Sequence, residues 1–480
     1  MFMKKISLLF SFLAVLLLLG CGTPAAPDPT PVVEAVAEQP TSTSAPTHTA
    51  VPTEIGETPT ATAVAEPATP TPLPAATTGI TETAVVTATA VVTATTPITP
   101  TGTLTATTEE DSEAADAEPT LAAPPPSSGV THPPYEPSEC GERYPCGDDR
   151  AGWEARIRVP DGFSVEYVAR LDGQPTVLDV GPDGQLYIAA MNGTIYRMDA
   201  AGNVSVYATG FTVPTGLAFQ PGTNRLYVSD RAVNRGIDGE SRISYVQGGA
   251  TTTIIRGLPC CYTGYHAANG IAFGPDGFGY VGVGSRADHG EILEGPNAGE
   301  QDMDLHPYEA TILRFSPDGG QVDVYARGFR NPYSLAWDAN GTLYTADNSP
   351  DYNPPEEFHR VVPGGEHGYP WYDCAVCFSP PPGVTVIPPT YTFIPNSAPT
   401  GVTAYLANQF PGYYNSIFVA LWSAFPGAQK IVRMAPGGSS GSNFATGFAA
   451  PIDMAVAPDG SLYVADWATH IIFRISYTGS

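Results

Sequence analysis

The sequence predicts an all-β fold, a six-bladed β-propeller preceded by a disordered stalk. Three observations support this prediction. A unit of short apolar segments recurs six times within residues 139–480. In several copies Asp-Gly separates two such segments, which is the strongest short-range signal for a β-hairpin. The residues before 139 are rich in Thr, Pro and Ala and carry too few large apolar side chains to form a core.

The chain begins with the features of a lipoprotein signal peptide, which we assign to residues 1–20. Lys4 and Lys5 precede an apolar run over 6–19, and small residues lead to Cys21. The processed chain would begin at a lipidated Cys21, so we expect an extracytoplasmic protein of the cell envelope, lipid-anchored to a membrane. The alternative is a transmembrane helix, but the apolar run is shorter than the about 20 residues that a bilayer requires.

Residues 21–138 are predicted to form an extended, disordered linker. Thr, Pro, Ala and Val dominate this segment, and its first aromatic residue is Tyr135. Such a composition buries too little apolar area to offset the entropy of the chain, and proline keeps the backbone extended. The fold is therefore expected to occupy residues 139–480.

The charge of the chain excludes one class of partner. The sequence has 48 acidic and 21 basic residues, which gives a formal net charge of -27. Because nucleic-acid binding requires a basic surface, we expect no nucleic acid as a partner.

The repeating unit predicts the blades of the propeller. It consists of an inner apolar segment, a turn, a second segment of the Leu-Tyr-Val type and a third that contains Arg. The units lie roughly 35 to 60 residues apart, as expected for a radial repeat. Six copies predict six blades, with five or seven as the alternatives, and the extra strand 163–168 is expected to close the ring by joining the last blade. The inner segments are 177–180, 216–219, 270–273, 334–337, 401–405 and 454–457.

Six cysteines remain after Cys21, and in an oxidising compartment they predict three disulfides. Their spacing favours pairs between near neighbours, although sequence alone does not fix the connectivity. One alternative for the Cys-x-x-Cys pair is a metal site shared with His359 or His367. The candidate pairs are Cys140 with Cys146, Cys260 with Cys261, and Cys374 with Cys377.

Three connections between predicted strands contain residue types that are typical of active sites. They span 260–269, 328–333 and 347–374. Loops on one face of a propeller surround its central channel, so we expect all three at one mouth. His266 and Arg330, together with carbonyl and carboxylate oxygens, would then form a candidate catalytic site.

These motifs resemble those of a known family. His266 precedes a strand that ends in Phe-Gly-Pro-Asp, Gly-x-Arg-Asn-Pro occupies 328–332, Asp347 is followed by Asn, and Pro-Gly-Gly opens the run 363–371. In this order the motifs are similar to those of the soluble quinoprotein sugar dehydrogenases. That glucose and sorbosone dehydrogenase group uses pyrroloquinoline quinone (PQQ), and the resemblance covers most of 156–480.

The resemblance implies a role for each matching residue. His266 would be the general base, and Arg330 with Asn331 would brace the quinone. Ca²⁺ would bind the backbone carbonyls of Ser349 and Pro350. Further cofactor contacts would come from Lys430 and Trp371, and an aromatic wall for the sugar would come from Tyr333, Tyr369 and Trp371.

The resemblance also implies the substrate and the partner. The substrate would be a sugar or a related small alcohol or aldehyde, and an electron acceptor of the envelope would re-oxidise the enzyme.

The chain departs from the family pattern at three places. Ala268 and Asn269 stand where the family has Gly-Gly, and His359 stands where it has Asn. In 421–430 Lys430 is the single cationic residue, whereas the family offers Arg there. Two alternatives from other functional classes remain open: a non-catalytic surface propeller that binds glycan or protein, and a metal-dependent lactonase with ligands Asp179, Asp453 and Asn269.

Overall fold

The computed structural model describes residues 141, 143–231, 239–261, 266–372, 374 and 376–479. All of them belong to the second of two compact units, Ala117–Ser480. The predicted signal peptide, the lipidation site Cys21, the stalk 21–138 and Cys140 lie outside the described residues. Within the described part, none of the helices combines the length and apolarity needed to cross a bilayer.

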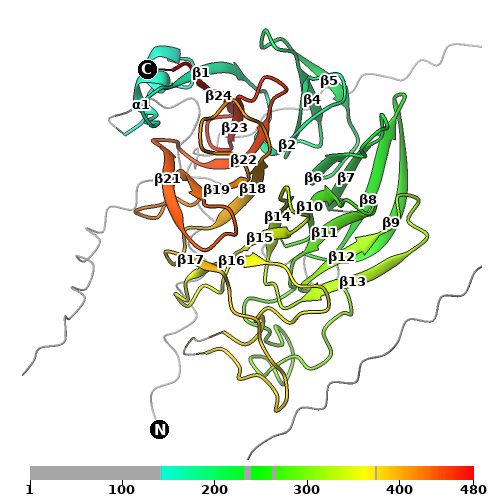
Figure 1. The fold of residues 1–480 in the computed structure, drawn as a ribbon. Coiled ribbons are helices and arrows are strands. Elements are labelled where there is room, and N and C mark those ends of the chain that lie inside the picture. The colour runs from blue at the N-terminus through cyan, green and yellow to red at the C-terminus, as the bar shows by residue number, and fades with distance from the viewer. Residues whose placement is uncertain are drawn as a thin grey trace, which may run out of the picture. The chain divides into compact units, whose positions relative to one another are not determined.

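Six four-stranded antiparallel sheets confirm the predicted all-β fold class and the number of blades (Figure 1). Blades 1 to 3 consist of β2 (Pro175–Val180), β3 (Leu186–Ala190), β4 (Ile195–Met198) and β5 (Val204–Ala208); β6 (Pro214–Phe219), β7 (Leu226–Arg231), β8 (Gly239–Gln247) and β9 (Ala250–Cys260); and β10 (Ala268–Phe273), β11 (Gly279–Val283), β12 (Thr311–Phe315) and β13 (Val322–Arg327).

Blades 4 to 6 repeat the same order from the inside of the ring outward. They consist of β14 (Pro332–Trp337), β15 (Leu343–Asp347), β16 (Glu356–Arg360) and β17 (Tyr391–Phe393); β18 (Pro399–Tyr405), β19 (Ser416–Leu421), β20 (Lys430–Met434) and β21 (Gly441–Thr446); and β22 (Pro451–Val456), β23 (Leu462–Asp466), β24 (Ile471–Tyr477) and β1 (Phe163–Arg170).

The first strand of the fold closes the ring, as predicted. β1 pairs with β24 from Phe163 opposite Tyr477 to Arg170 opposite Ile471, and Figure 1 shows the two strands side by side. The short helix α1 (Arg150–Arg156) precedes β1, and its buried Trp153 packs among the aromatic side chains of the last two blades. Closure through β1 pairs both ends of the fold in one sheet, with β1 as its outermost strand.

The innermost strands pack directly against one another around the ring, each against the next and β22 against β2. Neighbouring innermost strands lie so close together that several of them have glycine near their start, where a Cβ would have no room. A Cβ at Gly216 would collide with the carbonyl of Asn269, and one at Gly401 would collide with Asp453. This contact explains the glycine that opens inner segments in the sequence repeat.

Three alternate blades carry an aspartate at the end of the second strand: Asp230 on β7, Asp347 on β15 and Asp466 on β23. Each carboxylate accepts backbone N–H groups from the segment that enters the innermost strand of its own blade. For Asp466 the donors are Ala449 and Ala450, at 2.8 and 2.9 Å. These buried carboxylates fix the rim of the propeller, because they satisfy amides that have no strand partner.

We predict that Asp466→Ala lowers the free energy of unfolding by about 2 kcal/mol, because it leaves the buried amides of Ala449 and Ala450 without an acceptor. Urea unfolding followed by tryptophan fluorescence measures this change. Asp161→Ala is the control, since Asp161 is exposed and its loss should alter stability by no more than about 0.5 kcal/mol. Equal effects of the two substitutions would contradict the assignment.

Candidate active site

The antiparallel order within each blade brings the predicted site residues to one rim. An innermost strand begins where its neighbouring second strand ends. His266 lies just before β10, Arg330 and Asn331 lie just before β14, and Asn348 to Pro350 follow β15. The sequence assigned these residues to three separate loops, and the structure joins them through hydrogen bonds between blades 3 and 4.

His266 is held as a neutral base. Its side chain is 4% exposed, and its Nδ1 lies 3.0 Å from the carbonyl oxygen of Ser285 and 3.2 Å from the Ser285 hydroxyl. Because a carbonyl oxygen can only accept, Nδ1 carries the proton and Nε2 carries the lone pair. Burial and the nearby charge of Arg330 lower the pKa of His266 well below 6.5. The imidazole can therefore accept a proton at neutral pH.

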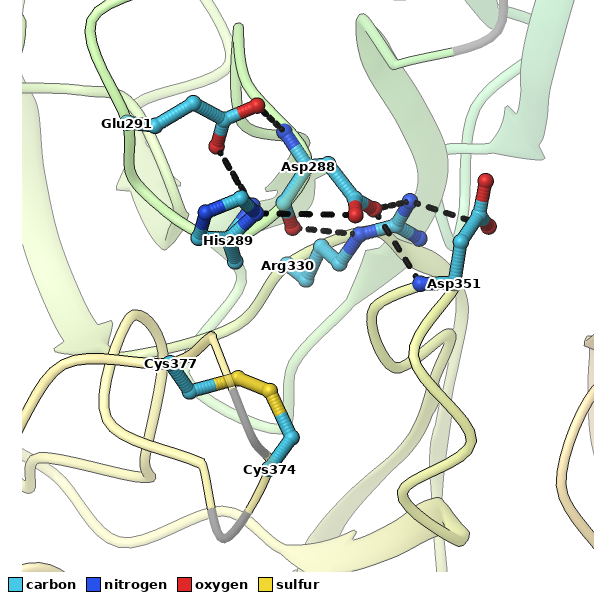
Figure 2. Close-up of a disulfide and its surroundings, with 7 residues drawn as sticks. All are labelled: Asp288, His289, Glu291, Arg330, Asp351, Cys374 and Cys377. Carbon is cyan, nitrogen blue, oxygen red and sulfur yellow. Dashed lines mark hydrogen bonds and ion pairs between the residues drawn. A yellow bond between two sulfur atoms is a disulfide. The ribbon is translucent and has the colours of Figure 1, made fainter. Parts of the chain in front are cut away.

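Arg330 is fixed by carbonyl and carboxylate oxygens on both sides (Figure 2). Its Nε donates to the carbonyl of Asp288 at 2.8 Å, its Nη2 to the Asp288 carboxylate at 2.5 Å, and its Nη1 to the carbonyl of Asn348 at 3.2 Å. Burial raises the pKa of Asp288, but hydrogen bonding to His289 and the charge of Arg330 outweigh it and bring the pKa to about 2. The pair is thus ionised and links the connection after β11 to the segment that enters β14, and the bond to Asn348 extends this link to the connection after β15.

Asp347 positions the backbone of the same segment. Its two carboxylate oxygens accept the N–H groups of Arg330 and Asn331, both at 2.7 Å, and one of them also accepts the hydroxyl of Tyr372 at 3.0 Å. Burial raises the pKa of Asp347 to about 6. The side chain of Asn331 accepts a hydrogen bond from Asn269 at 2.8 Å, so the residue that replaces the family glycine contacts the site.

Ser349 and Pro350 form a buried turn that suits a hard cation. The Ser349 amide donates to Glu356 at 2.7 Å and its hydroxyl donates to the carbonyl of Pro355 at 2.7 Å. Among the described residues no donor bonds to the carbonyl oxygen of Ser349, and the carbonyl of Pro350 begins the turn at Asp351 and Tyr352. Carbonyl oxygens are ligands that Ca²⁺ prefers, so the chemistry of this buried segment fits the predicted cation.

Two aromatic features complete the rim. Tyr333 of blade 4 donates its hydroxyl to the carbonyl of Thr176 in blade 1 at 3.1 Å, so its side chain crosses the ring and forms a floor. Trp422 and Trp467, which follow β19 and β23, pack edge to face at 5.4 Å and are only partly buried. They offer a flat ligand an apolar surface, and the sequence analysis did not single them out.

The predicted aromatic wall is not assembled. Tyr333 and Tyr369 are buried, and Tyr369 donates its hydroxyl to the carbonyl of Ala287. Trp371 and Tyr369 both line a separate cavity of about 220 Å³, and no residue of the His266 cluster lines that cavity. Burial of the aromatic rings in packing contacts explains the difference.

Lys430 also lies outside the cluster. It begins the third strand of blade 5, and its side chain lines a second cavity with Tyr391 and Phe393 of the outermost strand of blade 4. Burial lowers its pKa.

At the rim itself β7 ends in Arg231, a buried cation. The sequence analysis missed this residue because it is part of an ordinary strand pattern.

Blade 4 contains a second buried group, formed by Glu357, His359, His367 and Asp347. Val362 donates its N–H to His367 Nε2, the two histidines meet through their Nδ1 atoms at 3.3 Å, and His359 Nε2 lies 3.0 Å from Glu357. Ligand atoms of Asp347, Glu357 and His359 lie within 4.8 Å of one another, close enough for a metal ion. Because Val362 donates to Nε2 of His367, the proton of His367 lies on Nδ1 and is donated to Nδ1 of His359. The proton of His359 then lies on Nε2, which makes this nitrogen a donor to Glu357.

Disulfides join Cys260 to Cys261 and Cys374 to Cys377. The Cys-x-x-Cys pair therefore does not form the alternative metal site with His359 or His367, whose nitrogens bond to each other. Cys146 is disulfide-bonded, and its predicted partner Cys140 lies outside the described residues.

The residues of the lactonase alternative have structural partners. Asp453 accepts the N–H of Leu178 at 2.8 Å, and Asp179 accepts the N–H of Phe219 at 2.6 Å. Both carboxylates thus join innermost strands of neighbouring blades. Burial raises the pKa of Asp179 to about 6 and that of Asp453 to about 7, which reflects their enclosure in the ring.

Comparison with solved structures finds the same fold in two bacterial proteins. One is an oxidoreductase (glucose dehydrogenase) from Thermus thermophilus, which is 25% identical over 65% of this chain and 99% of its own, with a TM-score of 0.51. The other is the PQQ-bound aldose sugar dehydrogenase of Streptomyces coelicolor, 21% identical over 66% of this chain and 99% of its own, also with a TM-score of 0.51.

Sequence comparison identifies the family. Quinoprotein glucose dehydrogenase B of Acinetobacter calcoaceticus is 26% identical over 259 residues, which are 44% of this chain. The match spans about half (53%) of that relative's length. The model of the glucose / sorbosone dehydrogenase family matches residues 174–470, which include all of the rim residues described above. This chain therefore belongs to the glucose/sorbosone dehydrogenase family of six-bladed propellers.

Proposed function

We propose that the protein is an extracytoplasmic, membrane-anchored quinoprotein dehydrogenase that oxidises a sugar or a related small alcohol or aldehyde. One observation carries the proposal. His266 is buried and neutral, its Nδ1 proton is directed to Ser285, and the charge of the nearby Arg330 acts on it. Ser349 and Pro350 follow β15 at the same rim, where Arg330 bonds to the preceding Asn348. This combination supplies a proton acceptor and an oxygen-lined cation site in one place.

Each group of residues would have a separate role in the reaction. Nε2 of His266 would accept the proton of the substrate hydroxyl while hydride leaves the same carbon, so the C–OH becomes C=O. Bound PQQ would supply the two-electron acceptor for that hydride. The carbonyls of Ser349 and Pro350 would hold Ca²⁺, and Trp422 with Trp467 would offer an apolar face to the ring system.

The charge of Arg330 is already shared with Asp288, which limits what it can offer to an anionic ligand. The Nη1 group of Arg330 donates to the carbonyl of Asn348 and not to a carboxylate. Arg330 would therefore brace the cofactor with a hydrogen bond from this group while the Asp288 pair keeps the guanidinium in place. Arg231 would add a second positive charge at the rim.

Anchoring and electron transfer extend the proposal to the envelope. The lipidated Cys21 would hold the enzyme at a membrane, and the stalk 21–138 would separate the propeller from the lipid surface. An electron acceptor of the envelope would re-oxidise the enzyme after each turnover.

Reconstitution tests the enzymatic proposal. We expect the purified protein with PQQ and Ca²⁺ to reduce a dye in the presence of an aldose, and His266→Ala to lower kcat by about 10²- to 10⁴-fold. Omission of Ca²⁺ should weaken PQQ binding in an absorbance titration. The control is His470→Asn, which removes an imidazole outside the cluster from a left-handed backbone position that Asn tolerates. Failure of the wild-type protein to bind PQQ would contradict the proposal.

The pH profile should reflect the lowered pKa of His266. Because the neutral imidazole is the active form, kcat/KM should stay constant as the pH falls through 6.5, and activity should be lost only below that value. Arg330→Gln removes the positive neighbour, so the pKa of His266 should rise and the acid limb should move to higher pH. An acid limb at or above pH 6.5 in the wild-type protein would show that His266 is not the base.

Fractionation tests the anchor. Cys21→Ala should move the protein from the membrane fraction to the soluble fraction and remove the acyl mass from its N-terminal peptide. Thr43→Ala, in the stalk, should leave both unchanged. Retention of the Cys21→Ala protein in the membrane fraction would rule out a lipid anchor at this position.

A further inference from the structure

The disulfide between Cys374 and Cys377 lies near the ion pair of Arg330 and Asp288 (Figure 2). Of the residues that flank it, Tyr372 contacts the Asp347 carboxylate and Phe378 contacts His289. We name this group, Tyr372, Cys374, Cys377 and Phe378, the disulfide brace.

On one side of the disulfide the brace reaches the backbone of Arg330. The Tyr372 hydroxyl donates to Asp347 at 3.0 Å, and the same carboxylate accepts the N–H groups of Arg330 and Asn331. Tyr372 is buried, and Cys377 packs against the cluster that Tyr372 forms with Tyr369. Any movement of Tyr372 would therefore change the acceptor that fixes the start of β14.

On the other side the brace reaches the guanidinium. The ring of Phe378 stacks on His289, with ring centroids 5.7 Å apart and an angle of 29° between the planes. His289 Nδ1 lies 3.7 Å from the Asp288 carboxylate and 3.2 Å from that of Glu291. Asp288 in turn pairs with Arg330 and accepts the N–H of Asp351.

The short covalent loop makes these two contacts dependent on each other. The disulfide holds the Cα atoms of Cys374 and Cys377 5.1 Å apart, which limits how far the neighbouring Tyr372 and Phe378 can separate. Without the disulfide, Tyr372 would keep its position through its hydrogen bond to Asp347 and through packing, and Phe378 through its ring contact with His289.

We propose that the Cys374–Cys377 disulfide is a positioning element for Arg330, acting through Tyr372 on its backbone and through Phe378 and His289 on its guanidinium. The proposal deepens the proposed function, because it assigns to the brace the geometry of the quinone site. Cys374, Cys377, Tyr372 and Phe378 are positioning residues, since the described contacts reach the site only through Asp347 and Asp288.

Hydrogen exchange of the quinone-free protein tests the brace without any assumption about catalysis. In the variant Cys374→Ser with Cys377→Ser, the amides of Arg330 and Asn331 should exchange about tenfold faster, because the carboxylate that accepts them is less well fixed. The amides of Ala449 and Ala450 are the internal control, since Asp466 holds them in the same way in blade 6, away from the brace. They should exchange at the wild-type rate.

Two further variants separate the brace from a general loss of stability. Tyr372→Phe keeps the ring but removes the hydroxyl, and it should accelerate the same two amides even if the cysteine variant does not fold. Cys260→Ser with Cys261→Ser removes the other described disulfide and should leave the exchange of Arg330 and Asn331 unchanged. Unchanged exchange in both the Tyr372→Phe and Cys374→Ser/Cys377→Ser proteins, or equal acceleration at Ala449 and Ala450, would overturn the proposal.

A PQQ titration with Ca²⁺ then connects the brace to the site. We expect the dissociation constant to rise about tenfold in the cysteine variant, as for other partners that orient a binding group. If the wild-type protein binds no PQQ, the proposed function fails, and the exchange experiment still decides the brace. If the wild-type protein binds PQQ and the variant binds it equally well, the positioning role is refuted while the proposed function stands.

Discussion

The hydrogen bonds that the amides of Arg330 and Asn331 donate to Asp347 determine how this rim is built. A propeller leaves amides without strand partners wherever the chain enters an innermost strand, and a buried aspartate at the end of the second strand satisfies them. Asp230 and Asp466 perform this role in blades 2 and 6. In blade 4 the same device also presents an arginine to the rim, so a structural requirement of the fold places a residue of the site.

Burial determines what each polar group at the rim can do. Within a low-dielectric environment charged groups must be paired, and Arg330 is accordingly paired with Asp288. An uncharged base costs less to bury, which is consistent with the lowered pKa of His266 and its carbonyl partner Ser285. The site therefore combines one internally neutralised ion pair, one neutral base and a turn of carbonyl oxygens. In the proposed function, a bound cation would add the positive charge that an anionic cofactor requires.

The same residue types serve the fold and the site, and only their partners distinguish the two roles. Asp179 and Asp453 join innermost strands, although the sequence allowed them to be metal ligands. Lys430 lines a cavity with residues from the outermost strand of blade 4, although the sequence offered it as a cofactor contact. His359, which replaces a family asparagine, bonds to His367 and Glu357 in blade 4. For Asp179 and Asp453 the interaction that decides the role joins residues far apart in the chain, whereas the partners of His359 lie within the same blade.

The sequence alone determined the fold class, the six blades and the closing strand, because hairpin turns and alternating apolar segments are local signals. It also selected His266, Arg330 and the Ser349–Pro350 turn, because these lie in motifs of consecutive residues. Only the tertiary structure showed that Ser285 sets the tautomer of His266, that Asp288 and Asp347 hold Arg330, and that Tyr333 crosses to Thr176. Ser285 and Asp347 lie in the same blades as their partners, and antiparallel strand pairing brings them together. Asp288 comes from blade 3 and Thr176 from blade 1, so their contacts with blade 4 follow from packing between blades and closure of the ring, which no local pattern encodes.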